Sequence, residues 1–345
     1  MELYVNSGTG EAGSFTTGGN DTSDGLSYDT PKATIRAAIE TLDMPVTEDV
    51  TIHLARSGVD YIYDGSEPED GMDMKDLIIL GDGKIHFRAD WSEDFNLMDS
   101  STYPSGMETE DAYTLELPRL PKVEAGRNGC FEFFGVEIAV ESSETSVAVS
   151  SILATKVDLS SCRIKGATFG LNTLRSHSLV SNTLFQDNQI GIFAVDAATV
   201  LLAGKNIISN AMEVGLYVGG NGGAMMGPFT GGDIAELEIV TTYPREDYIA
   251  VKAVAHGQIV LDAVVPGFEQ PLPGIIRIIR DSEYDNDEYR GVVIESGSLI
   301  MGARNVSFKK PAEQFESTAL IDDSDTIPES RQFIVATEQG AVAIE

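Results

Sequence analysis

The sequence predicts an all-β fold, a right-handed parallel β-helix (solenoid) with a short N-terminal capping helix. An apolar pattern repeats every 21 to 23 residues within residues 129–220, a period typical of solenoids. Glycine is enriched, with 34 among 345 residues, as a fold with many tight turns requires. No run of 18 apolar residues occurs, so we expect no membrane insertion.

Residues 1–45 are predicted to form an opening strand, a loop and a helix. Thr30 and Pro31 match a helix N-cap followed by proline at the first helical position. We expect the helix to cover the open end of the β-stack, which would otherwise expose unpaired backbone. The apolar stripe of this helix consists of Ile35, Ala38, Ile39 and Leu42.

Residues 46–220 are predicted to form the coils, with acidic loop insertions in the early ones. One coil of a β-helix holds three short strands, and equivalent positions on neighbouring coils stack about 4.8 Å apart. We expect positive φ at a column of glycines, where the backbone must bend. That column contains Gly170, Gly191 and Gly215. A column of inward apolar side chains contains Ile138, Ile164, Phe185 and Ile208.

Two further details concern the third and fourth coils. Asp187, Asn188 and Asn210 lie where a left-handed turn residue is needed. In the fourth coil we expect Leu201 and Ala203 to point inward. Residues 221–345 are predicted to continue the stack with long loops, and a separate β domain is the alternative.

Charge and cysteine content narrow the function classes. Acidic residues outnumber basic ones by 55 to 23, which gives a net charge of −32. Such a surface repels polyanions, so we expect no nucleic-acid binding. The two cysteines, Cys130 and Cys162, are predicted to be buried thiols, because two cysteines form no disulfide framework.

The N-terminal motifs carry a family resemblance. Leu3–Asn6, Asp24–Ser27 and Thr30–Ile35 resemble the start of pectin-lyase-like right-handed parallel β-helix proteins, many of which belong to phage particles or degrade polysaccharides. The resemblance implies the fold strongly and the function weakly. The first residues also lack the pattern of a Sec-type signal peptide, although the fold is usually external. We therefore expect a location on the virion surface.

The expected function is a structural virion surface protein of the tail-spike, fibre or capsid-decoration type. Its expected partners are other virion proteins, further copies of itself (a homotrimer is favoured by the resemblance) and a host-surface polysaccharide. The alternative is a polysaccharide-degrading lyase or glycoside hydrolase on the same fold. The first hypothesis predicts flat outer faces buried against partner chains. The second predicts a groove with aromatic side chains and at least two close carboxylates.

Candidate catalytic residues are few, so the sequence leans towards a non-catalytic protein. Glu137, Asp158 and Asp187 could form the pairs Asp158 with Asp187 or Glu137 with Asp158. All three are equally well interpreted as solvated positions on strands and turns. Aromatic residues make up only 8% of the chain, whereas sugar grooves are usually lined by such rings.

No cofactor is predicted. The four histidines, at positions 53, 86, 177 and 256, are too far apart in the sequence for a metal-binding motif. The acidic run at residues 281–288 is the candidate for Ca²⁺, with Asp281, Asp285 and Asp287 as ligands. It matches no known calcium-loop spacing, and the sequence favours a solvated loop there.

Overall fold

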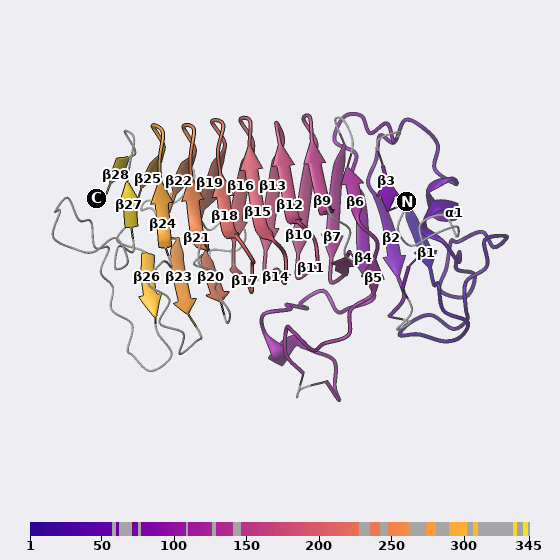
Figure 1. Cartoon of the computed structure of the whole chain (residues 1–345). Coiled ribbons are helices and arrows are strands. Elements are labelled where there is room, and N and C mark those ends of the chain that lie inside the picture. The colour runs from indigo at the N-terminus through magenta and orange to yellow at the C-terminus, as the bar shows by residue number, and fades with distance from the viewer. Residues whose placement is uncertain are drawn as a thin grey trace, which may run out of the picture.

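The structure is a computed structural model, and it shows a right-handed parallel β-helix. It describes residues 1–56, 60–61, 71–74, 77–107, 110–125, 129–140, 146–227, 235–241, 248–261, 274–280, 290–301, 306–309, 334–336 and 341–343. The strands stack along one axis, with the N-terminus near one end and the C-terminus near the other (Figure 1). Among the described residues they form three parallel sheets, of 11, 8 and 9 strands.

Each full coil contributes one strand to each sheet, in the order sheet 1, sheet 2, sheet 3. Sheet 1 contains β1 (Glu2–Val5), β2 (Val50–Leu54), β4 (Ile85–Ala89), β7 (Cys130–Phe134), β10 (Lys156–Ser160), β13 (His177–Ser181), β16 (Thr199–Ala203), β19 (Gly223–Met226), β22 (Gln258–Val260), β25 (Leu299–Met301) and β28 (Ala341–Ala343). Sheet 2 contains β5 (Arg119–Leu120), β8 (Glu137–Ala139), β11 (Arg163–Lys165), β14 (Leu184–Gln186), β17 (Lys205–Ser209), β20 (Glu236–Thr241), β23 (Ile275–Arg280) and β26 (Val306–Lys309). Sheet 3 contains β3 (Met72–Asp73), β6 (Val123–Ala125), β9 (Val147–Ile152), β12 (Phe169–Leu174), β15 (Ile190–Val195), β18 (Val214–Val218), β21 (Ile249–Ala253), β24 (Arg290–Ile294) and β27 (Ile334–Ala336). The strands after residue 220 therefore extend the same three sheets, while the division into three segments stays a prediction.

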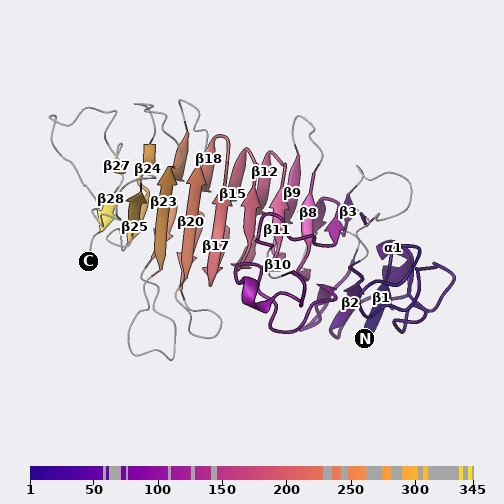
Figure 2. The ribbon, with the colours of Figure 1, turned by 90° about the horizontal axis from the view of Figure 1, so that it is seen from below.

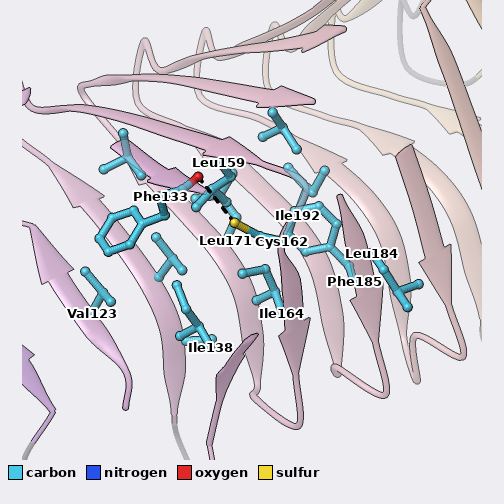
Figure 3. Packing of buried hydrophobic residues seen from close by; sticks show 14 of the residues in the cluster. Val123, Phe133, Ile138, Leu159, Cys162, Ile164, Leu171, Leu184, Phe185 and Ile192 are labelled. Carbon is cyan, nitrogen blue, oxygen red and sulfur yellow. Dashed lines mark hydrogen bonds between the residues drawn. The ribbon is translucent and has the colours of Figure 1, made fainter. Parts of the chain in front are cut away.

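The core is a set of stacked apolar columns inside the coils. Ile164 pairs with Ile138 on one side and with Phe185 on the other, and Phe185 pairs with Ile208. All four are buried, and Figure 3 shows Ile138, Ile164 and Phe185 following one another along sheet 2. Cys162 is buried nearby and its thiol donates to the Phe133 carbonyl at 3.3 Å (Figure 3). Both cysteines are free, but Cys130 is only half-buried, because it lies on the outer side of β7.

The glycine column lies on sheet 3, but our expected reason for it is wrong. Gly170, Gly191 and Gly215 are not among the residues with positive φ. A side chain is excluded because the coils approach closely: a Cβ on Gly170 would lie 2.6 Å from the carbonyl oxygen of Gly191. A Cβ on Gly191 would lie 2.7 Å from the Gly215 oxygen. Close backbone approach, not turn geometry, therefore requires glycine here.

The turns supply the positive φ values instead. Asp187 and Asn210 both have φ of 53°, as the turn pattern predicts. Asn188 does not; its buried amide bridges coils, accepting from the Ala167 amide and donating to the Ile164 carbonyl, both at 3.0 Å.

One coil is shifted by a residue relative to our prediction. Val200 and Leu202 fill the inward positions of β16, whereas Leu201 points outward and Ala203 is buried at the turn that follows. The turn between sheets 1 and 2 is one residue longer in this coil than in the coil before. Because side chains alternate along a strand, a shift of one residue reverses which side chains point inward.

The N-terminal helix is shorter than predicted and begins later. α1 spans Ile35–Ile39, and its N-cap is Thr34, whose hydroxyl accepts from the Ala37 amide. Thr30 and Pro31 are not its cap and first residue; Thr30 Oγ1 donates to Asp24 within the preceding loop. The apolar side chains of α1 join the main core, and α1 lies near the N-terminal end (Figure 1). Its role as a cover for the stack stays a prediction.

A long segment between β4 and β5 projects from the stack and includes the short 3₁₀ helix η1 (Ser100–Thr102). Figure 2, seen from below, shows this segment beside the sheet 2 strands. The Arg163 side chain, only 7% exposed, holds it in place by donating to the carbonyls of Ala112 and Leu115. Part of the outer face of sheet 2 is therefore covered by the chain itself.

Candidate active site

Four polar side chains form one row on the outer face of sheet 1. In the register of the strands, Thr51 of β2 is opposite His86 of β4. His86 is opposite Glu132 of β7, and Glu132 is opposite Asp158 of β10. Neighbouring strands lie about 4.8 Å apart, so the four side chains are close neighbours, and His86 contacts Glu132 directly. The alternation that sends Phe131, Phe133, Val157 and Leu159 inward sends Glu132 and Asp158 outward.

A pocket of about 310 Å³ surrounds this row. The Arg88 guanidinium forms part of the wall and lies 4.5 Å from the centre of the Phe134 ring. Ionic, hydroxyl and aromatic groups therefore meet in one hollow, which is what a polar ligand with an apolar face requires. The polar groups that line the pocket are Thr51, His86, Arg88, Glu132, Asp158 and Ser160.

Glu132 is held as a carboxylate by hydrogen bonds with two basic neighbours, His86 and Lys84. Nδ1 of His86 lies 2.8 Å from one of its oxygens, and Nζ of Lys84 donates to the other at 2.7 Å. The hydrogen bond from His86, with the one from Lys84, lowers the pKa of Glu132 to about 2 against the opposing effect of burial. The same hydrogen bonds raise the pKa of His86 and of Lys84. Glu132 therefore carries its negative charge at any moderate pH.

Asp158 has the opposite tendency. Its side chain is 14% exposed, and Oδ1 is buried without a hydrogen-bond partner among the described residues. Burial raises the pKa of Asp158, although Lys156 donates to Oδ2 at 2.6 Å and acts in the other direction. Of the two adjacent carboxyl groups, Asp158 is thus the one that takes up a proton first.

The two carboxyl groups form a pair with divided roles. Two titratable groups whose pKa values are pushed apart by their surroundings are the usual signature of an acid and its ionised partner. Their positions on adjacent strands place their backbones about 5 Å apart, and both side chains line the same pocket. Glycosidases use a pair of carboxyl groups that flank the scissile bond. The arrangement can donate a proton from Asp158 while Glu132 stabilises positive charge.

The structure does not bring either predicted carboxylate pair together. Glu137 lies on β8 of sheet 2, whereas Asp158 lies on sheet 1. Glu137 accepts from Arg163 at 2.7 Å, so it helps to orient the side chain that holds the projecting segment. Asp187 occupies the positive-φ turn after β14, where its amide donates to the Ser209 carbonyl. Of the three candidates, only Asp158 lies in the pocket.

Sequence reasoning missed Glu132 and His86 as site residues. Glu132 could have been found from the sequence, because aligning Phe131 with Val157 on adjacent coils places Glu132 opposite Asp158. His86 had no such signal, because the segment between β4 and β7 hides the repeat. Its role depends on a strand pairing that the sequence period does not show.

The structure tests the metal and membrane predictions only for the residues that it describes. Asp281, Asp285 and Asp287 lie outside the described residues. Where the structure does describe the chain, no three His, Cys, Asp or Glu side chains are grouped as ligands for a metal ion. Also within those ranges, no helix has the length and apolar character needed to cross a bilayer.

Comparisons with protein-family models, with curated proteins and with solved structures each found no match to this chain. The class to which the protein belongs is therefore defined by its own geometry. It is a right-handed parallel β-helix with a pocket on the outer face of sheet 1, where a protonatable and an ionised carboxyl group lie side by side.

Proposed function

We propose that the protein degrades a polysaccharide by hydrolysing a glycosidic bond in the sheet 1 pocket. The observation that carries this proposal is the pair Glu132 and Asp158, adjacent in register and with pKa values moved in opposite directions. The enzyme hypothesis predicts a groove with aromatic side chains and at least two close carboxylates. The adjacent carboxyl groups support its second part, and Phe134 is one aromatic side chain beside them.

The chemistry assigns a role to each group. Asp158 protonates the glycosidic oxygen, and the bond from that oxygen to the anomeric carbon breaks. Glu132 attacks the anomeric carbon as positive charge develops there, which forms a glycosyl ester. Ionised Asp158 then removes a proton from water, and the water oxygen displaces Glu132. The sugar leaves with its configuration retained, and Asp158 is again protonated.

The neighbouring groups would hold the substrate and keep the charges in place. Lys84 and His86 keep Glu132 ionised and limit its rotation. Thr51 at one end of the row, and Ser160 two residues beyond Asp158 on β10, offer hydroxyl groups to sugar hydroxyls. The Phe134 ring, already covered on one side by Arg88, adds an apolar surface of the kind on which sugar rings pack.

Two enzyme variants and one control test this proposal. The full chain is incubated with a panel of capsular and lipopolysaccharide glycans, and new reducing ends are counted. We expect Asp158→Asn and Glu132→Gln to lower the rate of product formation by about 10²-fold or more. Asp187→Asn makes the same chemical change outside the pocket, in a turn that asparagine tolerates, and should keep full activity. An Asp158→Asn rate close to that of the wild type, or a wild-type chain that cleaves none of the glycans, would refute the proposal.

A second candidate function is a non-catalytic virion surface protein, of the tail-spike, fibre or capsid-decoration type suggested by the resemblance to pectin-lyase-like β-helices. The observation that favours it is the outer face of sheet 3, which is largely apolar across five strands and suits burial against a partner chain, as this hypothesis predicts. Cross-linking of purified particles, followed by mass spectrometry, would identify its neighbours. This candidate requires cross-links to particle proteins from a chain that cleaves no glycan.

A further inference from the structure

The outer face of β9, β12, β15, β18 and β21 on sheet 3 has an unusual composition. None of these five strands contains Asp or Glu, although the chain holds 55 acidic residues, and Lys252 is their only charged side chain. We call this surface the acid-free face. Figure 1 shows β12, β15, β18 and β21 side by side. Its outward apolar side chains include Phe169, Ile190, Phe193, Leu174, Tyr217 and Ile249.

These strands carry apolar side chains on both sides, whereas a sheet with one face in water normally carries polar side chains on that face. The inner side belongs to the core, with Leu171 and Ile192 fully buried. On the outer side, Phe169, Phe193 and Tyr217 form a ladder with ring centres 5.0 and 4.8 Å apart. An outward sheet face in contact with water normally carries polar residues, and a contiguous apolar patch marks an interaction surface.

A buried polar atom on the same face also lacks a partner. Asn172 lies in the same row as Phe193 and Tyr217. Its Oδ1 is buried and accepts no hydrogen bond from the described residues, although the residue as a whole is only half-buried. Leaving a buried amide oxygen unpaired costs about 1–3 kcal/mol, so a rotation of the side chain that brings Oδ1 to an incoming donor would be favourable.

The charge of the chain indicates what this partner is. With a net charge of −32, two copies repel each other wherever their carboxylates meet. The acid-free face is a surface where two copies can approach without that repulsion. Its outward rows also repeat at the coil spacing of about 4.8 Å, and a second β-helix presents rows at the same spacing. A basic partner would instead be attracted to the acidic loops.

We propose that the acid-free face packs against the acid-free face of a second copy of this chain. The same patch on both subunits gives a twofold contact. Close to that axis, the Asn172 amides of the two copies donate to and accept from each other, which satisfies both Oδ1 atoms. This inference goes beyond the proposed hydrolysis and stands if that activity is absent. It also predicts pairs of chains, not the homotrimer that the family resemblance favours.

Light scattering of the full chain after gel filtration tests the contact. We expect twice the mass of one chain for the wild type and the mass of one chain for Phe193→Glu. The matched control, Leu201→Glu, adds the same charge to an outward apolar position of the next strand, β16 on sheet 1. It should keep the mass of two chains, and circular dichroism should show all three proteins folded.

A cross-link keeps the test decisive even if Phe193→Glu does not fold. Asn172→Cys, made with Cys130→Ser so that the only other cysteine is the buried Cys162, should form a disulfide-linked dimer on mild oxidation. A wild-type mass of one or three chains would overturn the proposal. So would dissociation by Leu201→Glu but not by Phe193→Glu, or an Asn172→Cys chain that forms no cross-link.

Discussion

Glu132 and Asp158 face outward from β7 and β10 of sheet 1, whereas Phe169 and Phe193 face outward from β12 and β15 of sheet 3. These strands come from overlapping coils, and their inward residues are equally apolar and buried. The two regions thus have one core and two different surfaces. Stacking determines which residues point inward, while the outward positions remain free to carry a charged pocket on one sheet and an apolar face on another.

The largest expected effect is on the rate of glycan cleavage, which should depend on the sheet 1 pocket and not on the acid-free face. Asp158→Asn should lower the rate of glycan cleavage by about 10²–10⁴-fold, since a positioned general acid contributes about that much. The opposite exchange on the acid-free face, Asn172→Asp, should leave the cleavage rate of each chain unchanged when the glycan is saturating. Initial rates measured at equal chain concentrations decide this, and comparable losses in both variants would contradict the division of roles.

The second prediction compares the backbones of the two sheets. Gly191→Ala on sheet 3 should lower the free energy of unfolding by about 1–3 kcal/mol, because the new Cβ would overlap the Gly215 carbonyl and Ile208. On sheet 1, Gly223→Ala would meet only the Gln258 oxygen, at an ordinary 3.8 Å, and should change stability by less than about 0.5 kcal/mol. Denaturant unfolding of both variants measures the difference. Equal costs would mean that the coils do not approach as closely as described.

The third prediction concerns pH, and only the sheet 1 face should respond. The pKa of Glu132 is about 2 when folded, below its ordinary value of 4.5, so its stabilising contribution is present above pH 4.5 and lost as pH falls towards 2. The pKa of His86 is raised, so its contribution is complete below pH 6.5 and lost as pH rises through the folded value. Between these limits, we expect Glu132→Gln to lower Tm by about 1–2 °C, which is the effect of about 1 kcal/mol on a chain of 345 residues.

Thermal melts at a series of pH values measure that window. Lys252→Gln on the acid-free face is the control, because Lys252 lies on sheet 3, away from Glu132 and His86, and the change in Tm should not follow their titration. A Glu132→Gln effect that persists undiminished at pH 2 would contradict the ion-pair explanation.

The smallest expected effect is a change in the pKa of Asp158, the proposed general acid. Lys156 lowers the pKa of Asp158, so Lys156→Met should raise it and move the alkaline limb of the pH–rate profile upward. We expect this upward shift to be small, because Lys156 is nearly half exposed and water screens its charge. Lys252→Met should leave the profile in place, and a downward shift with Lys156→Met would exclude Asp158 as the acid.

The sequence predicted the fold where the repeat is uninterrupted. Ile164 and Phe185 could be placed in one column because both follow the same short apolar alternation, and register transmits that placement from coil to coil. The prediction that Leu201 points inward was wrong by one residue, because the sequence period does not show how long each turn is. Thr30 and Pro31 matched a helix start, yet Thr34 supplies the cap.

The candidate site was less predictable because it depends on pairing across coils. Asp158 was recognised as a candidate, but its partner is Glu132, a neighbour in space that lies 26 positions away in the sequence. His86 comes from a coil that a long insertion separates from the others. The pKa difference within the pair also depends on burial and on Lys84, neither of which a residue pattern shows.

Placing the pocket and the acid-free face on different sheets has a consequence for avidity. Joining two chains through sheet 3 leaves both sheet 1 pockets uncovered, fixed at one separation by a rigid stack of coils. A polymer with a repeating unit offers both pockets the same ligand on one strand. Once the first pocket is occupied, the second meets its ligand at a high effective concentration, so the pair would hold a long glycan far more firmly than either chain alone.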